Sequence, residues 1–233
     1  MCLLAPLVNV NVYSVYKFCY QGRMSETDLD RRSRKRLATR EAISNAATRL
    51  FLERGFDRVT VDEIAAAADV GRMTVFNHFP RKEDMFFDRD AEGREAISAA
   101  LRDRDPAVAP IETLRQLAHR LVAERSPYLE FSDASRGFIA TVETSEALKA
   151  RARAIRDELA ALVAVTLAEG AGRDPADPEA RLAAEMVLAV WTTAFIQAHR
   201  AFGRGEAAEA VFLDLIDRGS RGVAVAMAGT PYA

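Results

Sequence analysis

The residues whose types and spacing could carry chemistry lie together in the stretch RMTVFNH, from Arg72 to His78. Within seven positions it supplies a guanidinium, a hydroxyl and a carboxamide, on Arg72, Thr74 and Asn77. A carboxamide can pair bidentately with adenine, a guanidinium can reach guanine or the backbone, and threonine can meet a thymine methyl or a phosphate. This combination favours contacts with nucleic acid over catalysis.

Helical geometry predicts which of these side chains point the same way. If Val75 and Phe79 face inward, a rotation of about 100° per residue turns Met73 and Asn77 directly outward. Thr74 then lies near the outward face, and its flanks are formed by Phe76 and His78. An exposed outer face on a short helix is typical of a recognition helix, here predicted from Arg72 to Phe79. The alternative is a small helical subdomain whose polar face is merely hydrated.

Two preceding helices are predicted to support this one. Between Leu37 and Arg54, an apolar stripe recurs with helical spacing, and Gly55 follows it. Thr60 with Glu63 has the pattern of a capping box, which opens a second helix. A turn at residues 69–71 joins that helix to the third, and Pro80 ends the third. The pattern predicts a three-helix helix-turn-helix unit.

Basic residues concentrate in the same part of the chain. Five of the six positions from Arg31 to Arg36 are basic, directly before the first predicted helix. Residues 31–89 contain 13 Lys and Arg against 9 Asp and Glu, whereas the whole chain has a net charge of −2. Only the early segment is therefore expected to face a polyanion, through phosphate contacts or entry into the minor groove. Alternatively, the basic run is only a solvated tail.

The stretch from about Arg40 to Phe86 resembles the TetR family of bacterial transcriptional regulators. The resemblance rests on many spaced positions, namely Gly55-Phe56, Thr60, Ile64-Ala65, Thr74, His78-Phe79 and Lys82-Glu83. It implies contacts to phosphates or bases from the positions Thr60, Thr74, Phe76, His78 and Lys82. Two departures are Gly71, where the family often has Ser or Thr, and Phe76, where Tyr is usual. The complete predicted DNA-binding set is Arg36, Arg40, Thr60, Arg72, Met73, Thr74, Phe76, Asn77, His78 and Lys82.

The first residues differ from the rest of the chain. Residues 1–23 are rich in Val, Tyr and Asn and hold both cysteines, Cys2 and Cys19. Because Met24 begins a more typical sequence, we interpret residues 1–30 as a disordered or extraneous extension. A short, aggregation-prone strand around Val10 to Tyr16 is the alternative. A disulfide or thiolate-metal design is excluded for the main fold, which contains no cysteine.

The remaining chain reads as alanine-rich helices separated by Pro, Gly and capping residues. We predict an all-α protein with a helix-turn-helix DNA-binding domain at residues 31–81 and a larger helical effector-binding and dimerisation domain at residues 82–233. The helices of the second domain are expected near 82–104, 110–125, 128–142, 145–169, 178–202 and 206–227. No run of about 18 apolar residues occurs, so a membrane span is not expected, and the bacterial cytoplasm is the predicted location.

The last two predicted helices suggest an assembly. The helix at 178–202 is apolar on more than one side, and the helix at 206–227 carries Gly219 and Gly222 on an apolar face. These surfaces predict a homodimer through a symmetric four-helix contact, which the family resemblance also implies. Alternatively, both surfaces are consumed inside one protomer. A dimer would hold two recognition helices about 34 Å apart, over successive turns of a palindrome.

The family resemblance further implies that the larger domain binds a small, mostly apolar effector. Its candidate contacts are the aromatic residues Phe131, Phe138, Trp191 and Phe195, although each could instead be packed core. We expect no cofactor and no metal. An enzyme is also not expected, because His119 and His199 have no carboxylate or nucleophile at catalytic spacing. A protein with the same fold that answers to a protein partner, or to no effector, is the alternative function.

Overall fold

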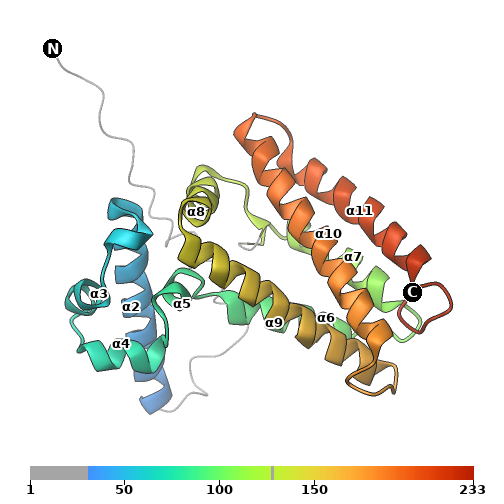
Figure 1. Cartoon of the computed structure of the whole chain (residues 1–233), viewed down its shortest axis with the longest axis horizontal. Helices are drawn as coiled ribbons and strands as arrows, with labels where there is room; N and C mark the ends of the chain where they lie inside the picture. Colours follow the sequence, from blue (N-terminus) through green and yellow to red (C-terminus); the bar gives the residue numbers. More distant parts are fainter. Residues whose placement is uncertain (1–30, 127–128) are drawn as a thin grey trace.

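The computed structural model describes residues 31–126 and 129–233, and within these ranges all regular structure is helical. This confirms the predicted all-α class. The predictions for residues 1–30 lie outside the described part of the chain. Two groups of helices are visible, a small one formed by α2, α3 and α4 and a larger one formed by α6 to α11, with α5 between them (Figure 1).

The small group contains α2 (Arg31–Arg54), the 3-10 turn η1 (Phe56–Arg58), α3 (Val61–Ala67) and α4 (Arg72–His78). The basic run at Arg31 to Arg36 forms the first turns of α2, so it is part of a helix and not a separate arm. Gly55 follows α2 with a φ of 83°, a conformation that glycine adopts without strain. The turn between α3 and α4 passes through Asp69, whose φ of 52° is also left-handed.

The capping box predicted at the start of α3 is confirmed. The Thr60 hydroxyl accepts from the Glu63 backbone N–H at 3.3 Å, and the Glu63 carboxylate accepts from the Thr60 backbone N–H at 2.8 Å. In contrast, Gly71 precedes α4 without a side-chain cap, as its lack of a side chain predicts. A buried core joins the three helices through Ile43, Ala47, Leu50, Phe51, Phe56, Val59, Ile64, Ala65, Val75 and Phe79. That core fixes the orientation of α4.

The single helix expected from 82 to 104 is wrong, because the chain forms α5 (Lys82–Phe86) and then α6 (Asp90–Arg102). The break has a tertiary cause at Asp88. Its carboxylate accepts a hydrogen bond from the Ser44 hydroxyl, and its carbonyl accepts one from Arg40 at 3.3 Å. These contacts to α2 hold the backbone of the link away from a continuous helix.

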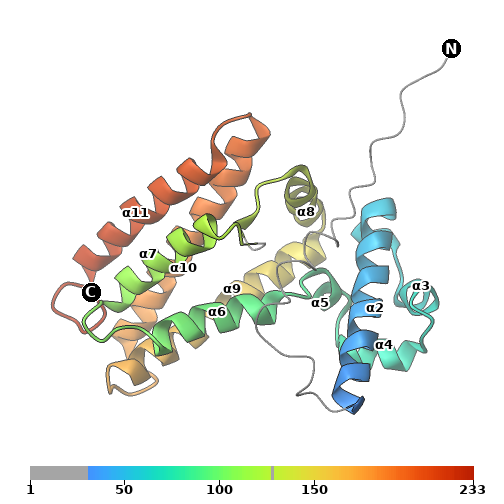
Figure 2. The same ribbon diagram turned by 180° about the vertical axis from the view of Figure 1, so that it is seen from behind.

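The larger group contains α7 (Pro110–Ala123), α8 (Asp133–Thr144), α9 (Glu146–Gly170), α10 (Pro178–Gly203) and α11 (Ala208–Ala226). Seen from behind, α6 and α7 cross in front of α9 and α10, and α11 runs along α10 (Figure 2). Helix α8 begins five residues later than the expected Tyr128, because Ser132 and Ser135 form a capping box there. The other boundaries agree with the predicted helices to within two residues.

Helix α10 is long and apolar enough to cross a membrane by length and composition alone, with a mean hydropathy of 1.2 over its most apolar window. It packs against both α9 and α11, and its buried positions include Ala183, Val187, Ala194 and Ala198. Its apolar character is therefore accounted for by a central position in a helical bundle.

Candidate nucleic-acid interface

Helix α4 turns the predicted face outward. Met73 is 70% exposed and Asn77 is exposed, whereas Val75 and Phe79 are fully buried against α2 and α3. Thr74 is half-buried beside Gly71. A seven-residue helix thus presents a carboxamide, a hydroxyl and a thioether to solvent from a rigid base.

The Arg72 guanidinium contacts two side chains, those of Asp62 and Phe76. Its Nη1 lies 2.7 Å from Asp62 Oδ2 of α3, and the guanidinium stands 5.5 Å from the centre of the Phe76 ring. Both members of the ion pair are more than half exposed, so the pair stabilises the fold little and can exchange for a phosphate. Phe76 itself is half-buried on the flank of α4.

Thr60 serves first to begin α3. Its hydroxyl also donates to Glu63 Oε2 at 2.8 Å, in addition to the capping box. The Thr60 backbone N–H, then the Thr60 hydroxyl, then Arg54 lower the pKa of Glu63 to about 2. The carboxylate is therefore ionised at neutral pH and holds Thr60, which remains exposed, in one place.

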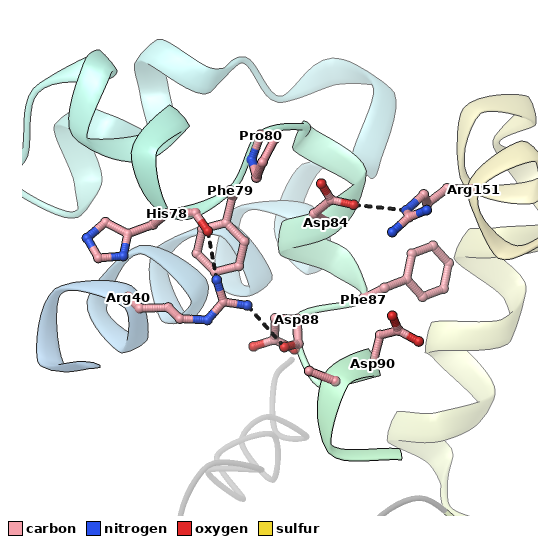
Figure 3. Close-up of a pocket in the computed structure, with 10 residues that line it drawn as sticks. Arg40, His78, Phe79, Pro80, Asp84, Phe87, Asp88, Asp90 and Arg151 are labelled. Carbon is pink, nitrogen blue, oxygen red and sulfur yellow. Dashed lines mark hydrogen bonds and ion pairs between the residues drawn. The ribbon is translucent and has the colours of Figure 1, made fainter. Parts of the chain in front are cut away.

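Arg40 is directed into the protein. Its guanidinium donates to the His78 carbonyl at 2.7 Å and to the Asp88 carbonyl at 3.3 Å, and it lies 4.0 Å from the centre of the Phe79 ring. Figure 3 shows Arg40 between the end of α4 and the link that leads to α6. The side chain therefore holds the end of α4 in place.

Lys82 is also engaged internally. Its ammonium donates to the carbonyls of Phe56 at 2.9 Å and Val59 at 3.0 Å, and it stands 4.1 Å from the centre of the Phe56 ring. An ammonium has three donors, so one is left over for a phosphate. Lys82 thereby ties α5 to the segment that precedes α3.

Arg36 and His78 approach one another at the junction of α2 and α4. Burial lowers the pKa of His78, and the charges of Arg36 and Arg40 lower it further. The imidazole is therefore neutral at physiological pH. Arg36 is exposed, as are its basic neighbours in the first turns of α2, so this end of the helix offers positive charge beside α4.

Ion pairs connect α5 to the larger helical group. Arg151 of α9 lies 2.9 Å from Asp84 Oδ1 of α5 and 2.8 Å from Glu158 Oε1. Glu158 in turn pairs with Arg94 of α6, whose Nε contacts Asp90 at 2.7 Å. Beside this network a cavity of about 200 Å³ is lined by residues that include Arg40, His78, Pro80, Phe87 and Asp88 (Figure 3). Sequence reasoning missed this network, since its partners on different helices are too distant in the chain for any local pattern.

The four aromatic residues predicted to contact an effector do not lie together. Phe138 stacks on Phe86 of α5, with ring centres 4.5 Å apart, and also meets the edge of Phe87. It therefore lies where α8 contacts α5, and the prediction that it shares one cavity with the other three is wrong. Its position on α8 turns it towards α5 instead of α10.

The other three aromatic candidates belong to one cluster, which we call the α10 aromatic cluster and define as Phe131, Trp191, Phe195, His199 and Phe212. The His199 ring lies 5.0 Å from that of Phe131 and 4.5 Å from that of Phe195, both edge-on. Phe212 of α11 contacts the rings of Phe131 and Trp191 at 6.1 Å. His199 was not predicted, although its spacing of four residues from Phe195 and eight from Trp191 puts it on the same face of a helix.

The small-residue face of α11 packs largely inside the protomer. Phe212, Ile216 and Val223 are buried, and a side chain added at Gly219 would collide with Val190 of α10. Outside this contact, Leu182 is 53% and Val225 77% exposed, and Ala189 and Gly222 are exposed too. The apolar surface free for a second copy is therefore smaller than the sequence pattern suggested.

No group of three or more potential metal ligands occurs among the described residues.

The same part of the chain matches known proteins in sequence. Residues 43–88 match the family of bacterial regulatory proteins described as the tetR family. The HTH-type transcriptional regulator TcmR of Streptomyces glaucescens is 35% identical over 83 residues, which cover 36% of this chain and 37% of TcmR. The HTH-type transcriptional repressor BepR of Brucella suis biovar 1 is 50% identical over 48 residues, or 21% of this chain and 23% of BepR. The matches thus span less than half of these relatives.

The fold likeness extends over most of the chain. The solved structure of a SmeT-triclosan complex superposes with a TM-score of 0.53 at 21% identity and covers 79% of this chain and 91% of that one. The helix-turn-helix geometry, the family match and this shared architecture point the same way. Residues 43–88 therefore carry the helix-turn-helix of the tetR family of bacterial regulatory proteins, and the chain shares the fold of the SmeT structure.

Proposed function

We propose that the protein is a transcriptional repressor that binds a palindromic operator as a homodimer and is released by a small, mostly apolar effector. The observation that carries this proposal is the outward face of α4, where Met73 and Asn77 are exposed on a helix whose other side is fully buried. Within the described ranges Met73 and Asn77 remain uncovered, and a short helix with such a face has the dimensions of a major-groove reader.

On DNA, the outward residues of α4 have distinct roles. Asn77 pairs with a base, Thr74 and Met73 meet base edges or methyl groups, and Arg72 exchanges Asp62 for a phosphate or guanine. Thr60, Phe76 and His78 contact sugar and phosphate at the flanks. Arg36 supplies charge to the backbone, whereas Arg40 and Lys82 act chiefly by holding α4 and η1 in position. The third donor of Lys82 adds one phosphate contact.

A homodimer through α10 and α11 sets the separation of two such helices. Support comes from the exposed apolar side chains Leu182, Ala189 and Val225 on these helices. One short helix reads too few base pairs to define a site, whereas two copies read two half-sites of a palindrome. The dimer therefore supplies the specificity that one α4 lacks.

An effector in the larger domain is supported by the α10 aromatic cluster, where the ring nitrogens of His199 and the indole nitrogen of Trp191 are buried without hydrogen-bond partners. The triclosan in the SmeT complex is a small molecule bound by a protein of the same fold. The name of BepR supports repression as the direction of control.

The alternative is a regulator of the same fold that responds to a protein partner or to no effector. The proposed activity involves no catalysis, and the protein would work in the cytoplasm on the nucleoid.

Competition binding tests the DNA-binding proposal directly. Inverted repeats near the gene provide candidate operators, and each labelled duplex is challenged with an unlabelled copy or with a scrambled duplex of equal length and composition. We expect the specific competitor to be at least about a thousandfold more effective at physiological salt. Equal competition by both duplexes would instead identify a non-specific, architectural DNA-binding protein.

A further inference from the structure

Three buried polar atoms in the α10 aromatic cluster have no hydrogen-bond partner. They are both ring nitrogens of His199 and the indole Nε1 of Trp191. Across the described residues the only other buried side-chain atom of this kind is Asn45 Oδ1, which belongs to α2. Buried polar groups in folded proteins are nearly always paired, so three unpaired atoms in one cluster call for a missing partner.

Three members of the cluster lie in a row along one face of α10. Trp191, Phe195 and His199 follow one another at intervals of four residues, which places the first and last roughly 12 Å apart along the helix axis. Phe131 meets the His199 ring edge-on, and Phe212 of α11 meets the Trp191 ring edge-on. Phe131 belongs to the link before α8 and to no helix, so moving its ring breaks no helical hydrogen bond.

Among the residues that the structure describes, no charged side chain pairs with His199. His199 is only 5% exposed, and burial alone lowers the pKa of its imidazole. The side chains packed in the same core are apolar, among them Leu129, Ala194, Ile216 and Phe202. A neutral imidazole has one donor and one acceptor, and the indole adds a second donor. An ionised group brought into this core would lose its hydration without finding a counter-charge.

We propose that the effector is an uncharged aromatic molecule that inserts into the α10 aromatic cluster and hydrogen-bonds His199 and Trp191 through hydroxyl or carbonyl groups. This inference rests on the proposed function, since it names the class of molecule that the regulator senses. The rings of Phe131, Phe195 and Phe212 hold the flat part of the ligand by edge-to-face contacts. Carboxylates of the same shape are rejected.

Three probes of matched shape test the proposal by isothermal titration calorimetry. They are 2-naphthol, with a neutral hydroxyl, 2-methylnaphthalene, with no hydrogen-bonding group, and 2-naphthoate, with a charge. We expect 2-naphthol to bind the wild-type protein roughly tenfold more tightly than either of the others. Equal binding of 2-naphthol and 2-methylnaphthalene, tighter binding of 2-naphthoate, or no binding of any probe would overturn the proposal. This comparison requires no substitution and therefore does not depend on the folding of a variant.

The variant His199→Phe assigns the preference to a residue. It keeps an aromatic ring and removes both nitrogens, so 2-methylnaphthalene binding is expected to persist while the preference for 2-naphthol disappears. His119→Gln is the matched control, because that histidine pairs with Asp217 outside the cluster and its loss should leave the preference unchanged. A preference that survives in His199→Phe would contradict the assignment.

Two further readouts separate this inference from the proposed function. Trp191 is the only tryptophan of the chain, so a single indole N–H resonance reports whether 2-naphthol reaches it. A resonance that does not move on binding places the probe elsewhere and overturns the proposal. Operator binding is measured without any probe, so its failure would refute the repressor function and leave the calorimetric result intact.

Discussion

Asn77 is the residue on which base recognition by this protein should depend most directly. Its carboxamide is exposed at the centre of the outward face of α4, where it can form two hydrogen bonds with one base. We expect Asn77→Ala to reduce the preference for the operator over single-base variants at one position by about 1–3 kcal/mol. Affinity for a scrambled duplex should be unchanged, since the substitution removes no charge.

The measurement is a titration of wild-type and variant protein with a set of single-base operator variants. Arg102→Ala is a suitable control. Arg102 is exposed at the far end of α6, so this substitution changes a surface residue away from α4. An operator preference that stays intact in Asn77→Ala would mean that α4 does not enter the major groove as proposed.

Lys82 combines a structural role with one spare donor. Lys82→Met keeps an unbranched side chain and removes the two hydrogen bonds to the Phe56 and Val59 carbonyls together with the ammonium contact on the Phe56 ring. Since the ammonium is half-exposed, we expect a loss of about 1–2 kcal/mol in the free energy of unfolding. Affinity should fall for all duplexes, with a salt slope smaller by about one.

Urea denaturation and salt-dependent binding check these two effects. Lys35→Met removes a charge from an exposed position of α2 and should change binding but not stability. Unchanged stability in Lys82→Met would show that the carbonyl contacts contribute nothing to the fold.

At the scale of elements, the contact between α10 and α11 depends on the absence of a side chain at Gly219. A Cβ built there would stand 2.6 Å from Val190 Cγ2 and nearer still to Cγ1. We expect Gly219→Ala to lower the free energy of unfolding by about 1–3 kcal/mol, because the two helices must move apart. Trp191 of α10 also contacts Phe212 of α11, so this tight helix contact helps to position the α10 aromatic cluster.

Gly93→Ala is the matched control, since Gly93 lies inside α6 with nothing within 4 Å of an added Cβ. It should be neutral or stabilising by up to about 1 kcal/mol. The double variant Gly219→Ala with Val190→Ala should recover part of the lost stability, and purely additive effects would exclude a direct collision.

At the scale of the whole molecule, the ion-pair network and Asp88 join the DNA-reading helices to the larger bundle. Asp84, Arg151 and Glu158 connect α5 to α9, and Phe138 stacks α8 on the same α5. Movement of α8, which begins next to Phe131, would therefore reach α5 and the Lys82 contacts. These contacts would give the proposed effector in the α10 aromatic cluster a physical route to α4.

The buried carboxyl of Asp88 predicts a pH dependence of stability. Burial raises the pKa of Asp88, against the hydrogen bond from Ser44 and the charges of Arg89 and Arg40. From about pH 4 up to the raised pKa, the folded protein holds a proton that the unfolded chain has released. The contribution of Asp88 to the free energy of unfolding therefore falls as the pH rises through this interval. Asp88→Asn cannot ionise, so its stability relative to wild type should increase over the same interval.

Urea denaturation of both proteins at several pH values measures this difference, in which the other carboxylates cancel. Asp103→Asn, at an exposed position after α6, should track the wild-type curve. Parallel curves for Asp88→Asn and wild type would mean that Asp88 ionises in the folded protein as it does in the unfolded chain.

Much of the local structure of this protein could be predicted from its sequence alone. The capping box at Thr60, the left-handed glycine after α2 and the orientation of α4 all depend on residues within a few positions of one another. The helical class, most helix boundaries and the exposure of Met73 and Asn77 were predictable for that reason.

Only the tertiary structure decided which long side chains point outward and which aromatic residues meet. Arg40 and Lys82 carry the charge expected of DNA contacts, yet carbonyls brought close by the fold bind them. Phe138 of α8 stacks on Phe86 of α5, His199 contacts Phe131, and the hydrogen bond from Ser44 to Asp88 lies at the break in the helix expected from 82 to 104. Each of these outcomes depends on contacts between residues tens of positions apart. Hydrophobic periodicity reports only on residues a few positions apart, so it could not predict these contacts.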